Sequence, residues 1–467
     1  MITSRPNSSP TGISRRRFLR SASAGAAAAA AFPAVLRAAR PNGNVQVAVV
    51  GVSARGYGDL HSTASHAKVK YVGFCDVDAR AFTKADADHP GTPHFADYRV
   101  MLEKLGDTVD AVIVATPDHM HAPVSVAAMQ RGKHVFCQKP LAHTVWECRQ
   151  MRLWAEKRGV ITQMGNQIHS AVEYRLATRL LREGVIGKVK EVHSWVAVGG
   201  NERTCLLEPP AESAPVPAGL DWDLWLGAAP QRPYSPGLYH PFAWRDWQDF
   251  GGGALGDFGC HILDPVFTGL GLTAPVSITA ENSGVNRHIW PTTETVRYVF
   301  PGTEYTAGET LKVTWTDGGL RPERKLAQMP GDLDLPKSGS LFIGEKGNMV
   351  LPHVGGPRLY PVENFTGFTY PKDIRGVNHW HAWIDGIISG QRTSAGFHYA
   401  GLLAETVQLG NVATRVARRS TITRGTRKAD DASTLRWDSA NFRIANNPTA
   451  QALLTKAYRP GWNVPAA

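Results

Sequence analysis

Residues 110–141 constrain the fold of this chain most, because they follow the pattern of a strand, a helix and a second strand. Asp110–Ala115 is a short β-branched run, and Met120–Arg131 reads as a helix that Gly132 ends. His134–Cys137 begins the next strand. The pattern predicts a βαβ unit, in which the two strands are parallel and ligands bind outside their carboxyl ends.

Lys139 follows the second of these strands and precedes Pro140. Proline disfavours a helical conformation for the residue before it, so we expect Lys139 to be extended at the carboxyl edge of the sheet. A lysine in that position can meet a substrate oxygen beside a cofactor. The alternative is an ordinary exposed lysine after a strand.

A second pattern upstream predicts a dinucleotide-binding fold. Val45–Val50 is an almost continuous apolar run, as expected of a strand buried on both faces, and it leads into a turn that starts at Gly51 and reaches Gly56. The usual fingerprint is G-x-G-x-x-G, which permits a tight turn and a close approach of the backbone to pyrophosphate. Here Ser53 replaces the second glycine.

The acid expected to bind the cofactor ribose is Asp76. It follows the strand predicted at Tyr71–Cys75, at the spacing from Gly51 typical of the residue that binds the ribose 2′-hydroxyl. An acid there would repel a 2′-phosphate, and Val77 follows rather than arginine, so NAD is favoured over NADP. Asp78 is the alternative ribose ligand, and Asp76 has the alternative role of a turn residue.

These motifs resemble the Gfo/Idh/MocA oxidoreductases, named for glucose-fructose oxidoreductase, inositol dehydrogenase and a rhizopine-catabolism protein. The resemblance is carried by the glycine turn, the acid after the second strand, Ala115–His121 and Gly132–Pro140. It implies an α/β protein with an N-terminal Rossmann domain and a C-terminal α/β domain built on a large, mostly antiparallel sheet. The departures are Ser53 and Gln138, where the family commonly has glutamate before Lys-Pro.

The resemblance and the strand ends together predict the cofactor site. NAD is the expected cofactor, and the residues expected to bind it are Gly51, Ser53, Ala54, Arg55, Asp76, Thr116, Pro117, His121, Gln138, Lys139 and Asn166.

The remaining catalytic candidates lie in Phe250–Asp264, which is glycine-rich at first and then apolar, with polar residues at 257, 261 and 264 on one helical face. Family members place an aspartate and, four residues later, a histidine on this helix, and Asp257 and His261 match these positions. A carboxylate can orient an imidazole and raise its basicity. We therefore predict that Lys139, Asp257 and His261 are the catalytic residues.

Other readings of these residues are weaker. Asp257 could cap a helix, and His261 could be satisfied by backbone groups. The glycine run lacks the Gly-Lys-Ser/Thr ending of a phosphate loop. Asp257, His261 and Asp264, together with the separate pair His379 and His381, offer possible metal ligands. Three polar residues on one helix without a clear fourth ligand do not indicate a zinc site.

The predicted reaction is hydride transfer from a carbinol carbon to nicotinamide. Either His261 or Lys139 takes the hydroxyl proton, and the sequence leaves open which one. The aromatic residues of Tyr239–Trp247 suit a sugar ring, and domain packing explains them equally well.

The first 40 residues predict export. Ser14–Arg20 contains S-R-R-x-F-L and precedes an alanine-rich, mildly apolar stretch at Ser21–Leu36, which resembles a twin-arginine signal peptide. This stretch is too weakly apolar to span a membrane, so contact with a membrane is expected only during export. Residues 1–40 contain seven arginines, and their removal lowers the formal net charge from +11 to +4, so nucleic-acid binding is not indicated.

We predict three regions: the signal peptide at 1–40, the NAD-binding domain at 41–165, and a C-terminal domain at 166–467 with a docking tail. An exposed face of the second sheet would suit a dimer or tetramer. The five cysteines form no recognisable disulfide framework.

Three functions remain. The first is an exported, periplasmic NAD-dependent oxidoreductase of a sugar, glycoside or cyclitol. The second is a redox-neutral enzyme that retains NAD and cleaves or epimerises its substrate through a keto intermediate. The third is a non-catalytic binding protein for a sugar or nucleotide.

Overall fold

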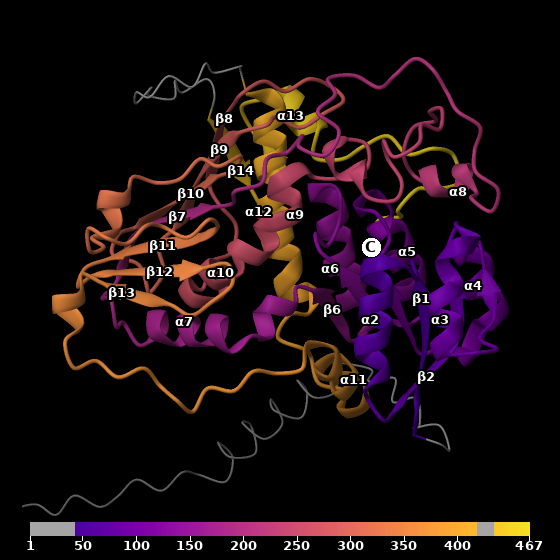
Figure 1. The fold of residues 1–467 in the computed structure, drawn as a ribbon, viewed down its shortest axis with the longest axis horizontal. Helices are drawn as coiled ribbons and strands as arrows, with labels where there is room; N and C mark the ends of the chain where they lie inside the picture. Colours follow the sequence, from indigo (N-terminus) through magenta and orange to yellow (C-terminus); the bar gives the residue numbers. More distant parts are fainter. Residues whose placement is uncertain (1–42, 418–433) are drawn as a thin grey trace, which may run out of the picture. The chain divides into compact units, whose positions relative to one another are not determined.

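The computed structural model describes residues 43–417 and 434–467, so the predicted signal peptide lies outside the described residues. Two sheets lie on either side of a long helix, α12 (Phe397–Val416), drawn in yellow near the centre of Figure 1. The predicted fold class, a Rossmann domain followed by an α/β domain with a mostly antiparallel sheet, is confirmed.

The first sheet is a six-stranded parallel sheet with the order β3-β2-β1-β4-β5-β6. Its central strands are fully buried, as their apolar runs require. The chain order reverses between β1 and β4, which places the ligand crevice at the carboxyl ends of these two strands. The strands are β1 (Val45–Val50), β2 (Val69–Cys75), β3 (His94–Phe95), β4 (Ala111–Val114), β5 (His134–Gln138) and β6 (Thr162–Gly165).

Helices cover both faces of this sheet. The predicted βαβ unit corresponds to β4, α5 and β5, and α6 begins with a reciprocal capping box between Thr144 and Glu147. The helices that follow these strands are α2 (Ala54–Ala64), α3 (Thr83–Asp88), α4 (Tyr98–Leu105), α5 (His121–Gln130) and α6 (Val145–Arg158). Short 3-10 turns occupy Ala79–Phe82, Gly106–Thr108, Asp118–Met120 and Gln167–Ser170.

One helix from much later in the chain completes the first core. Helix α11 (His379–Ser389) packs against β1 and α2, and its Trp383 is fully buried with its ring centroid 5.6 Å from that of Phe136 on β5. The Rossmann core therefore contains residues from the first strands of the chain and from a helix that follows most of the second sheet.

The second sheet has nine strands in the order β13-β12-β11-β7-β10-β9-β8-β14-β15. Its neighbours pair antiparallel except for β7 and β10, which are parallel. The strands are β7 (Val189–Trp195), β8 (Ser277–Asn282), β9 (Glu294–Pro301), β10 (Thr310–Thr316), β11 (Gly339–Gly344), β12 (Asn348–Pro352), β13 (Arg358–Tyr360), β14 (Leu435–Asp438) and β15 (Arg443–Ile444).

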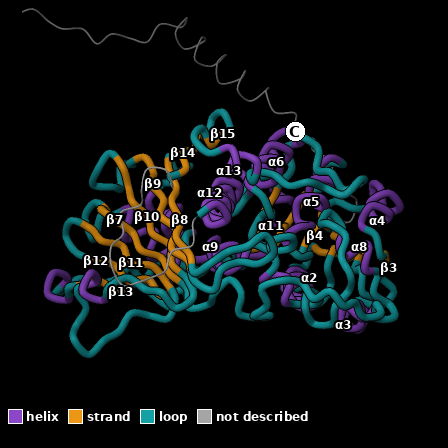
Figure 2. The backbone as a smooth tube through the Cα atoms, turned by 90° about the horizontal axis from the view of Figure 1, so that it is seen from above, coloured by secondary structure: helices purple, strands orange, loops and turns teal. Residues whose placement is uncertain are grey.

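Helices pack on one face of this sheet, with α12 in contact with β8, β9, α6 and α9 (Figure 2). The helices of this part of the molecule are α7 (Val172–Arg182), α9 (Gly253–Ile262), α10 (Asp264–Leu270), α12 and α13 (Pro448–Ala452). Helix α8 (Trp222–Leu226) lies beside the Rossmann domain instead (Figure 1). Short 3-10 turns lie at Ala243–Asp246, Arg324–Ala327 and Val362–Phe365. Residues alternate between buried and more exposed along β8 and β9, as expected when the second face is not covered by helices.

The helix expected across Phe250–Asp264 is in fact two helices, because α9 ends at Ile262 and Asp264 opens α10. This break removes Asp264 from the face that carries Asp257 and His261.

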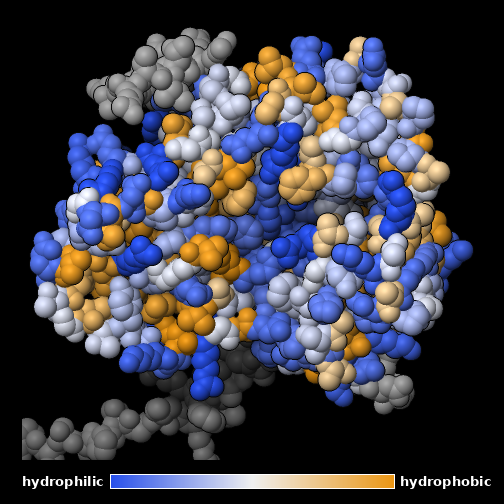
Figure 3. Space-filling view, in the orientation of Figure 1, coloured by the Kyte–Doolittle hydropathy of each residue, from blue (hydrophilic) through white to orange (hydrophobic). Residues whose placement is uncertain are grey.

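Within the described part of the chain, no helix has both the length and the apolar composition needed to cross a bilayer. Hydrophobic and hydrophilic residues are interspersed on the face shown in Figure 3, and the centre of that face is mostly hydrophilic.

Candidate active site

A cavity of about 710 Å³ lies between the carboxyl edge of the parallel sheet and residues of the second domain. Every residue predicted from the sequence for cofactor binding or catalysis lines it, with the exception of Asn166. The Rossmann wall is formed by Gly51, Ser53, Ala54, Arg55, Asp76, Thr116, Pro117, His121, Gln138 and Lys139. The opposite wall includes Trp225, His240, Phe242, Trp244, Arg245, Asp257, His261 and Trp462.

The glycine turn between β1 and α2 is closely packed, and its two glycines are required by their surroundings. Gly51 has a φ of +83°, and a Cβ there would lie 2.6 Å from the carbonyl oxygen of Ala115. A Cβ on Gly56 would overlap the carbonyl oxygen of Gly51. Ser53 is the N-cap residue of α2, and its side chain is exposed and makes no capping hydrogen bond. The serine that replaces the second glycine therefore leaves the first turn of α2 open, and a helix N-terminus favours anions.

Asp76 and Asp78 have different surroundings, which separates the two candidate ribose ligands. Asp76 lies in the cavity and accepts hydrogen bonds from the backbone amides of Val52, at 2.9 Å, and Asp78, at 3.1 Å. Burial raises the pKa of Asp76, and these two amide hydrogen bonds partly oppose the rise.

Asp78 is instead buried in an ion pair. It accepts hydrogen bonds from Arg80 at 2.6 and 2.8 Å, and its Oδ2 lies 3.0 Å from Nε2 of His240. The hydrogen bond from Arg80 lowers the pKa of Asp78 to about 2, with His240 as a further partner. Geometry thus favours Asp76 as the residue available to a ribose.

The turn after β4 is tied to the turn that carries Lys139. His121 is buried, and its Nδ1 lies 2.7 Å from the carbonyl oxygen of Pro140, while its Nε2 lies 2.8 Å from that of Thr116. Burial lowers the pKa of His121 to about 4, despite these two carbonyl contacts. His121 therefore links two loops that line the cavity, and its neutral ring, with a single N–H, can donate to one of these two carbonyl oxygens at a time.

Gln138, the departure from the family pattern, has a charged partner. Its Nε2 donates to Oδ2 of buried Asp59 on α2 at 2.7 Å, and Trp380 donates to Oδ1 of the same carboxylate at 3.0 Å. Burial raises the pKa of Asp59 to about 6, while the hydrogen bonds from Trp380 and Gln138 oppose the rise. The negative charge that a glutamate would bring to position 138 lies on the neighbouring helix instead.

Lys139 and Asp257 form the central contact of the site. Lys139 Nζ donates to Oδ1 of Asp257 at 2.6 Å and to its backbone carbonyl at 2.7 Å. The other oxygen, Oδ2, accepts from Nη2 of Arg203 at 3.0 Å and lies 3.5 Å from Nε of Arg245. Burial alone would raise the pKa of Asp257, but the charges of Lys139, Arg245 and Arg203 and the hydrogen bond from Lys139 hold it well below its usual range.

The predicted pairing of Asp257 with His261 is wrong, because the Asp257 carboxylate is engaged by Lys139 and Arg203. His261 is half-buried one turn further along α9, with its ring centroid 5.6 Å from that of His353. Its Nδ1 is buried and has no hydrogen-bond partner among the described residues. Burial and the nearby positive charge of Lys139 hold the pKa of His261 well below its usual value, so its imidazole is neutral.

Asn166 does not reach the cavity, in contrast to the prediction from sequence. It is fully buried after β6, and its side-chain amide donates to the carbonyl oxygen of Cys260 on α9 at 2.9 Å. Its position couples the edge of the parallel sheet to the helix that carries Asp257 and His261.

Asp118 and the two arginines are site residues that the sequence did not single out. Asp118 lies between Pro117 and His119 in the predicted motif, and its Oδ2 accepts a hydrogen bond from the amide of Gly252 at 3.2 Å. Burial raises the pKa of Asp118 to about 7, and the charge of Arg245 opposes this rise while that of Asp257 adds to it. Its motif position was the only available signal, since its environment comes from the second domain.

The cofactor end of the cavity is covered by α8 and by the segment that follows α13. Trp462 is buried and lines the cavity near Tyr98. The guanidinium carbon of Arg99 lies over its indole ring, 4.1 Å from the ring centroid. Arg459 donates to the Asp223 carboxylate at 2.7 Å and to the Gly227 carbonyl at 2.8 Å. These bonds join the late segment to α8.

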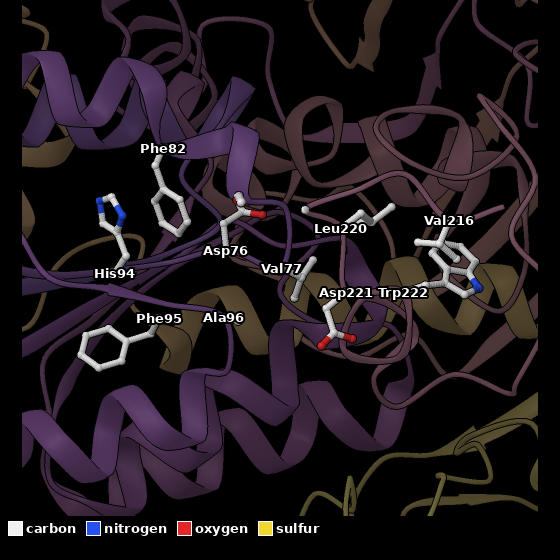
Figure 4. Close-up of a pocket in the computed structure, with 12 residues that line it drawn as sticks. Asp76, Val77, Phe82, His94, Phe95, Ala96, Val216, Leu220, Asp221 and Trp222 are labelled. Carbon is white, nitrogen blue, oxygen red and sulfur yellow. The ribbon is translucent and has the colours of Figure 1, made fainter.

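A second cavity of about 620 Å³ adjoins the first at Asp76, Val77 and Ala96. Figure 4 shows the Asp76 carboxylate near its middle, with Phe82 and His94 on one side and Leu220 and Trp222 on the other. The proline-rich excursion at 208–219 ends against this site, because the carbonyl of Gly219 accepts a hydrogen bond from the amide of Ala79 at 2.8 Å.

The histidines considered as metal ligands are engaged elsewhere. Nδ1 of His379 lies 2.8 Å from the Ser170 hydroxyl and its Nε2 lies 2.9 Å from the Met164 carbonyl. His381 Nε2 lies 2.7 Å from the hydroxyl of Ser65. Within residues 43–417 and 434–467, no group of three or more His, Cys, Asp or Glu residues could hold a metal ion.

Comparison with known families decides the identity of the fold. Residues 45–166 match the NAD-binding Rossmann domain of the Gfo/Idh/MocA oxidoreductase family, and residues 197–303 match a C-terminal α/β domain of the same family. These two regions of the chain are thus similar to the two domains of that family. NAD is accordingly the cofactor of its Rossmann domain, and the glycine turn and Asp76 fit that group.

Curated Gfo/Idh/MocA-like relatives match over short stretches. A glycosyl hydrolase family 109 protein of Shewanella woodyi is 29% identical over 156 residues, which cover 31% of this chain and 32% of the relative. The 2,7-anhydro-N-acetylneuraminate hydratase of Mediterraneibacter gnavus is 39% identical over 88 residues, which cover 19% of this chain and 24% of the hydratase. The chain thus spans about a third or less of the length of these relatives.

Solved structures share the fold over most of the chain. The WlbA dehydrogenase of Bordetella pertussis, in complex with NADH and UDP-GlcNAcA, aligns with a TM-score of 0.55 and 16% identity, covering 79% of this chain and 96% of its own. Levoglucosan dehydrogenase, in complex with NADH and levoglucosan, aligns with a TM-score of 0.53 and 16% identity, covering 79% and 97%. At these identities the likeness concerns the fold.

Proposed function

We propose that this protein is an NAD-dependent oxidoreductase that removes hydride from a carbinol carbon of a sugar, glycoside or cyclitol. One observation carries the proposal: a single cavity contains the glycine turn and Asp76 at one end and Lys139, Asp257 and His261 at the other. Its cofactor specificity follows from Asp76, since a carboxylate held by two amides accepts ribose hydroxyls and repels a 2′-phosphate.

The residues of the site divide the work as follows. NAD, when bound, supplies the hydride acceptor. Asp257 holds the Lys139 ammonium in place through a 2.6 Å hydrogen bond, and that ammonium stabilises negative charge on the substrate oxygen. His261 is neutral and lines the cavity, so it is suited to accept the hydroxyl proton.

A redox-neutral reaction with retained NAD is the second candidate. The curated relatives include a glycosyl hydrolase family 109 protein and a hydratase. In this chain α8 and Trp462 line the cofactor end of the cavity, which supports slow exchange of NAD.

One experiment separates the candidates. The purified protein is denatured, the released nicotinamide cofactor is quantified, and turnover of sugars, glycosides and cyclitols is followed with and without added NAD. A requirement for added NAD supports a net dehydrogenase, and stoichiometric NAD with turnover but no net reduction supports the redox-neutral reaction. Sugar or nucleotide binding without any hydride transfer would leave the non-catalytic binding protein as the remaining function.

Export by the twin-arginine pathway is also proposed, on the basis of residues outside the described structure. Because the pathway carries folded proteins, it fits an enzyme that acquires its cofactor before leaving the cytoplasm. Changing Arg15→Lys and Arg16→Lys together should leave folded precursor in the cytoplasm, as fractionation would show. Periplasmic accumulation of this double variant, in which no two arginines remain adjacent, would contradict the assignment.

We propose a dimer or tetramer assembled through the less covered face of the nine-stranded sheet, where β8 and β9 alternate in burial. Size-exclusion chromatography with light scattering tests this, and a monomeric mass would contradict it.

A further inference from the structure

Arg245 is the cation in the cavity that the proposed chemistry does not use. It lies in the 3-10 turn Ala243–Asp246, lines the cavity, and has a side chain that is 20% exposed. Its guanidinium carbon lies 4.1 Å from the ring centroid of Trp244 and 4.5 Å from that of Phe242. Contact with aromatic faces restrains a guanidinium while leaving its N–H edges available.

Few of the hydrogen-bond donors of Arg245 are used within the protein. Its Nη1 donates to the carbonyl oxygen of Phe242 at 3.1 Å, and its Nε lies 3.5 Å from Oδ2 of Asp257. An arginine has five N–H donors in a planar fork, and two neighbouring donors match the two oxygens of a carboxylate. Donors of Arg245 therefore remain for a ligand in the cavity.

The charges around the site leave a positive surplus at this point. Arg203 is balanced by Asp246, which accepts its Nη1 at 2.9 Å and its amide at 2.8 Å, in addition to its contact with Asp257. Asp257 alone then faces both Lys139 and Arg245. The other nearby acid, Asp118, is buried, which favours its neutral form and weakens its contribution to charge balance.

We propose that Arg245 binds a carboxylate of the substrate, and that the protein acts on an acidic sugar in preference to a neutral one. The inference rests on the proposed function of the same cavity and specifies its substrate class. Binding the acid at Arg245 would place it beside Lys139 and Asp257, so that one hydroxyl of the same ring can lie near the Lys139 ammonium. A carboxylate fits better than a phosphate dianion, because the Asp257 carboxylate beside Arg245 repels a second negative charge.

The test compares probes that differ only at one group. Glucuronate, its neutral amide glucuronamide, glucose and glucose 6-phosphate are titrated by calorimetry into the NAD-bound protein, and reduction of bound NAD is followed by absorbance. We expect glucuronate to bind about 10- to 100-fold more tightly than glucuronamide, the scale of a hydrogen-bonded charged pair. Arg245→Gln should abolish this preference while leaving glucuronamide affinity within about threefold.

Two further variants serve as controls for the Arg245→Gln result. Arg245→Lys keeps a charge beside Asp257 but lacks the two-donor edge, so it should fold and retain only part of the preference. Arg179→Gln removes an exposed arginine that pairs with Glu183 and Asp373 far from the cavity, and should behave as the wild type. Circular dichroism and thermal midpoints check the fold of each variant.

Every outcome bears on the proposal. Equal affinity for glucuronate and glucuronamide, tighter binding of glucose 6-phosphate, a preference that survives Arg245→Gln, or no binding of any probe would overturn it. Carboxylate-selective binding without reduction of NAD would support the role of Arg245 and count against the proposed oxidoreductase function. Reduction of NAD by glucose as efficiently as by glucuronate would support that function and overturn the role of Arg245.

Discussion

The two walls of the cavity are built in different ways. On the Rossmann wall, Gly51, Asp76, Thr116 and Lys139 each lie in the first residues after a parallel strand, so backbone geometry places them. The opposite wall combines residues of α8, of α9, of the segment between these helices, and Trp462, which are far apart in sequence. Charged and aromatic contacts, such as Arg459 with Asp223 and Arg99 with Trp462, hold the late segment in place. The comparison teaches that the cofactor half is specified locally, whereas the substrate half depends on tertiary contacts.

The largest effects should come from the residues that would touch the reacting oxygen. His261→Ala should slow hydride transfer by about 10² to 10⁴, because the proton acceptor is lost. Lys139→Met should slow it by about 10² to 10³, because charge on the oxygen is no longer stabilised, while NAD binding changes little. Single-turnover reduction of bound NAD measures both.

If Lys139 and His261 act on one oxygen, the double variant should lose less than the product of the single effects. Exposed Arg179→Gln serves as the control for each. Near wild-type rates in both single variants would place the chemistry outside this pair.

The next largest effect concerns Asp118, which follows β4 yet contacts the opposite wall. Its pKa is raised by burial to about 7, above its unfolded value of 3.8, so the stability it contributes is present at low pH and is lost as pH rises through about 7. Asp118→Asn lacks this titration. The free energy of unfolding of the wild type, relative to this variant, should therefore fall by about 2 to 3 kcal/mol between about pH 5 and pH 8.5.

Denaturant titrations at the two pH values measure this difference. Asp78→Asn is the matched control, because the pKa of Asp78 is lowered to about 2 and its contribution is lost only as pH falls below the unfolded value toward 2. A pH-independent difference for Asp118→Asn would show that its carboxyl does not titrate in this range.

A smaller effect tests the Rossmann wall of the cavity. Asp76→Ala should weaken NAD binding by about 1.5 to 3 kcal/mol, the scale of a hydrogen bond to a charged group. Asp78→Asn should leave NAD affinity nearly unchanged, since Asp78 is committed to Arg80 and His240. Calorimetric titration of cofactor-depleted protein measures both, and the reverse pattern would transfer the ribose site to Asp78.

The smallest effect concerns the late segment. Arg459→Gln breaks its contact with Asp223 on α8, and the partly exposed pair should be worth about 0.5 to 1.5 kcal/mol. NAD should then dissociate about 2- to 10-fold faster, as stopped-flow release would show. Arg321→Gln, on an exposed pair with Asp334, is the control. An unchanged release rate would mean that this segment does not limit cofactor exchange.

The same contrast explains which parts of the site the sequence could predict. Gly51, Asp76 and Lys139 could be predicted to lie at the cavity, where the structure places them, because a strand end and its turn are encoded within a few residues. The sequence showed that Gln138 departs from the family pattern but not which residue it contacts, because its partner Asp59 lies on helix α2. The sequence around Arg245 offered only its aromatic neighbours as a signal. Those aromatic residues could equally contact a sugar ring or pack between domains, and the sequence alone could not separate the two roles.

The incorrect predictions have tertiary causes as well. Asn166 was expected at the cofactor, but the Cys260 carbonyl lies within reach of its amide. Asp257 was expected to orient His261, but its two carboxylate oxygens accept hydrogen bonds from Lys139 and Arg203. Helix α11 was expected within the second domain, yet Trp383 belongs to the core under β1 and β5. Each of these contacts spans more than 50 residues of sequence.

The position of Trp462 has a consequence for the order of events during synthesis. Domains generally fold as their residues emerge from the ribosome, N-terminal parts first. The strands and glycine turn of the Rossmann domain are made early, but α11, which completes its core, and Trp462, which lines its cavity, are made hundreds of residues later. A nascent chain therefore presents an open, unfinished nucleotide groove for most of its translation, and the cofactor is enclosed only after the late segment has folded back.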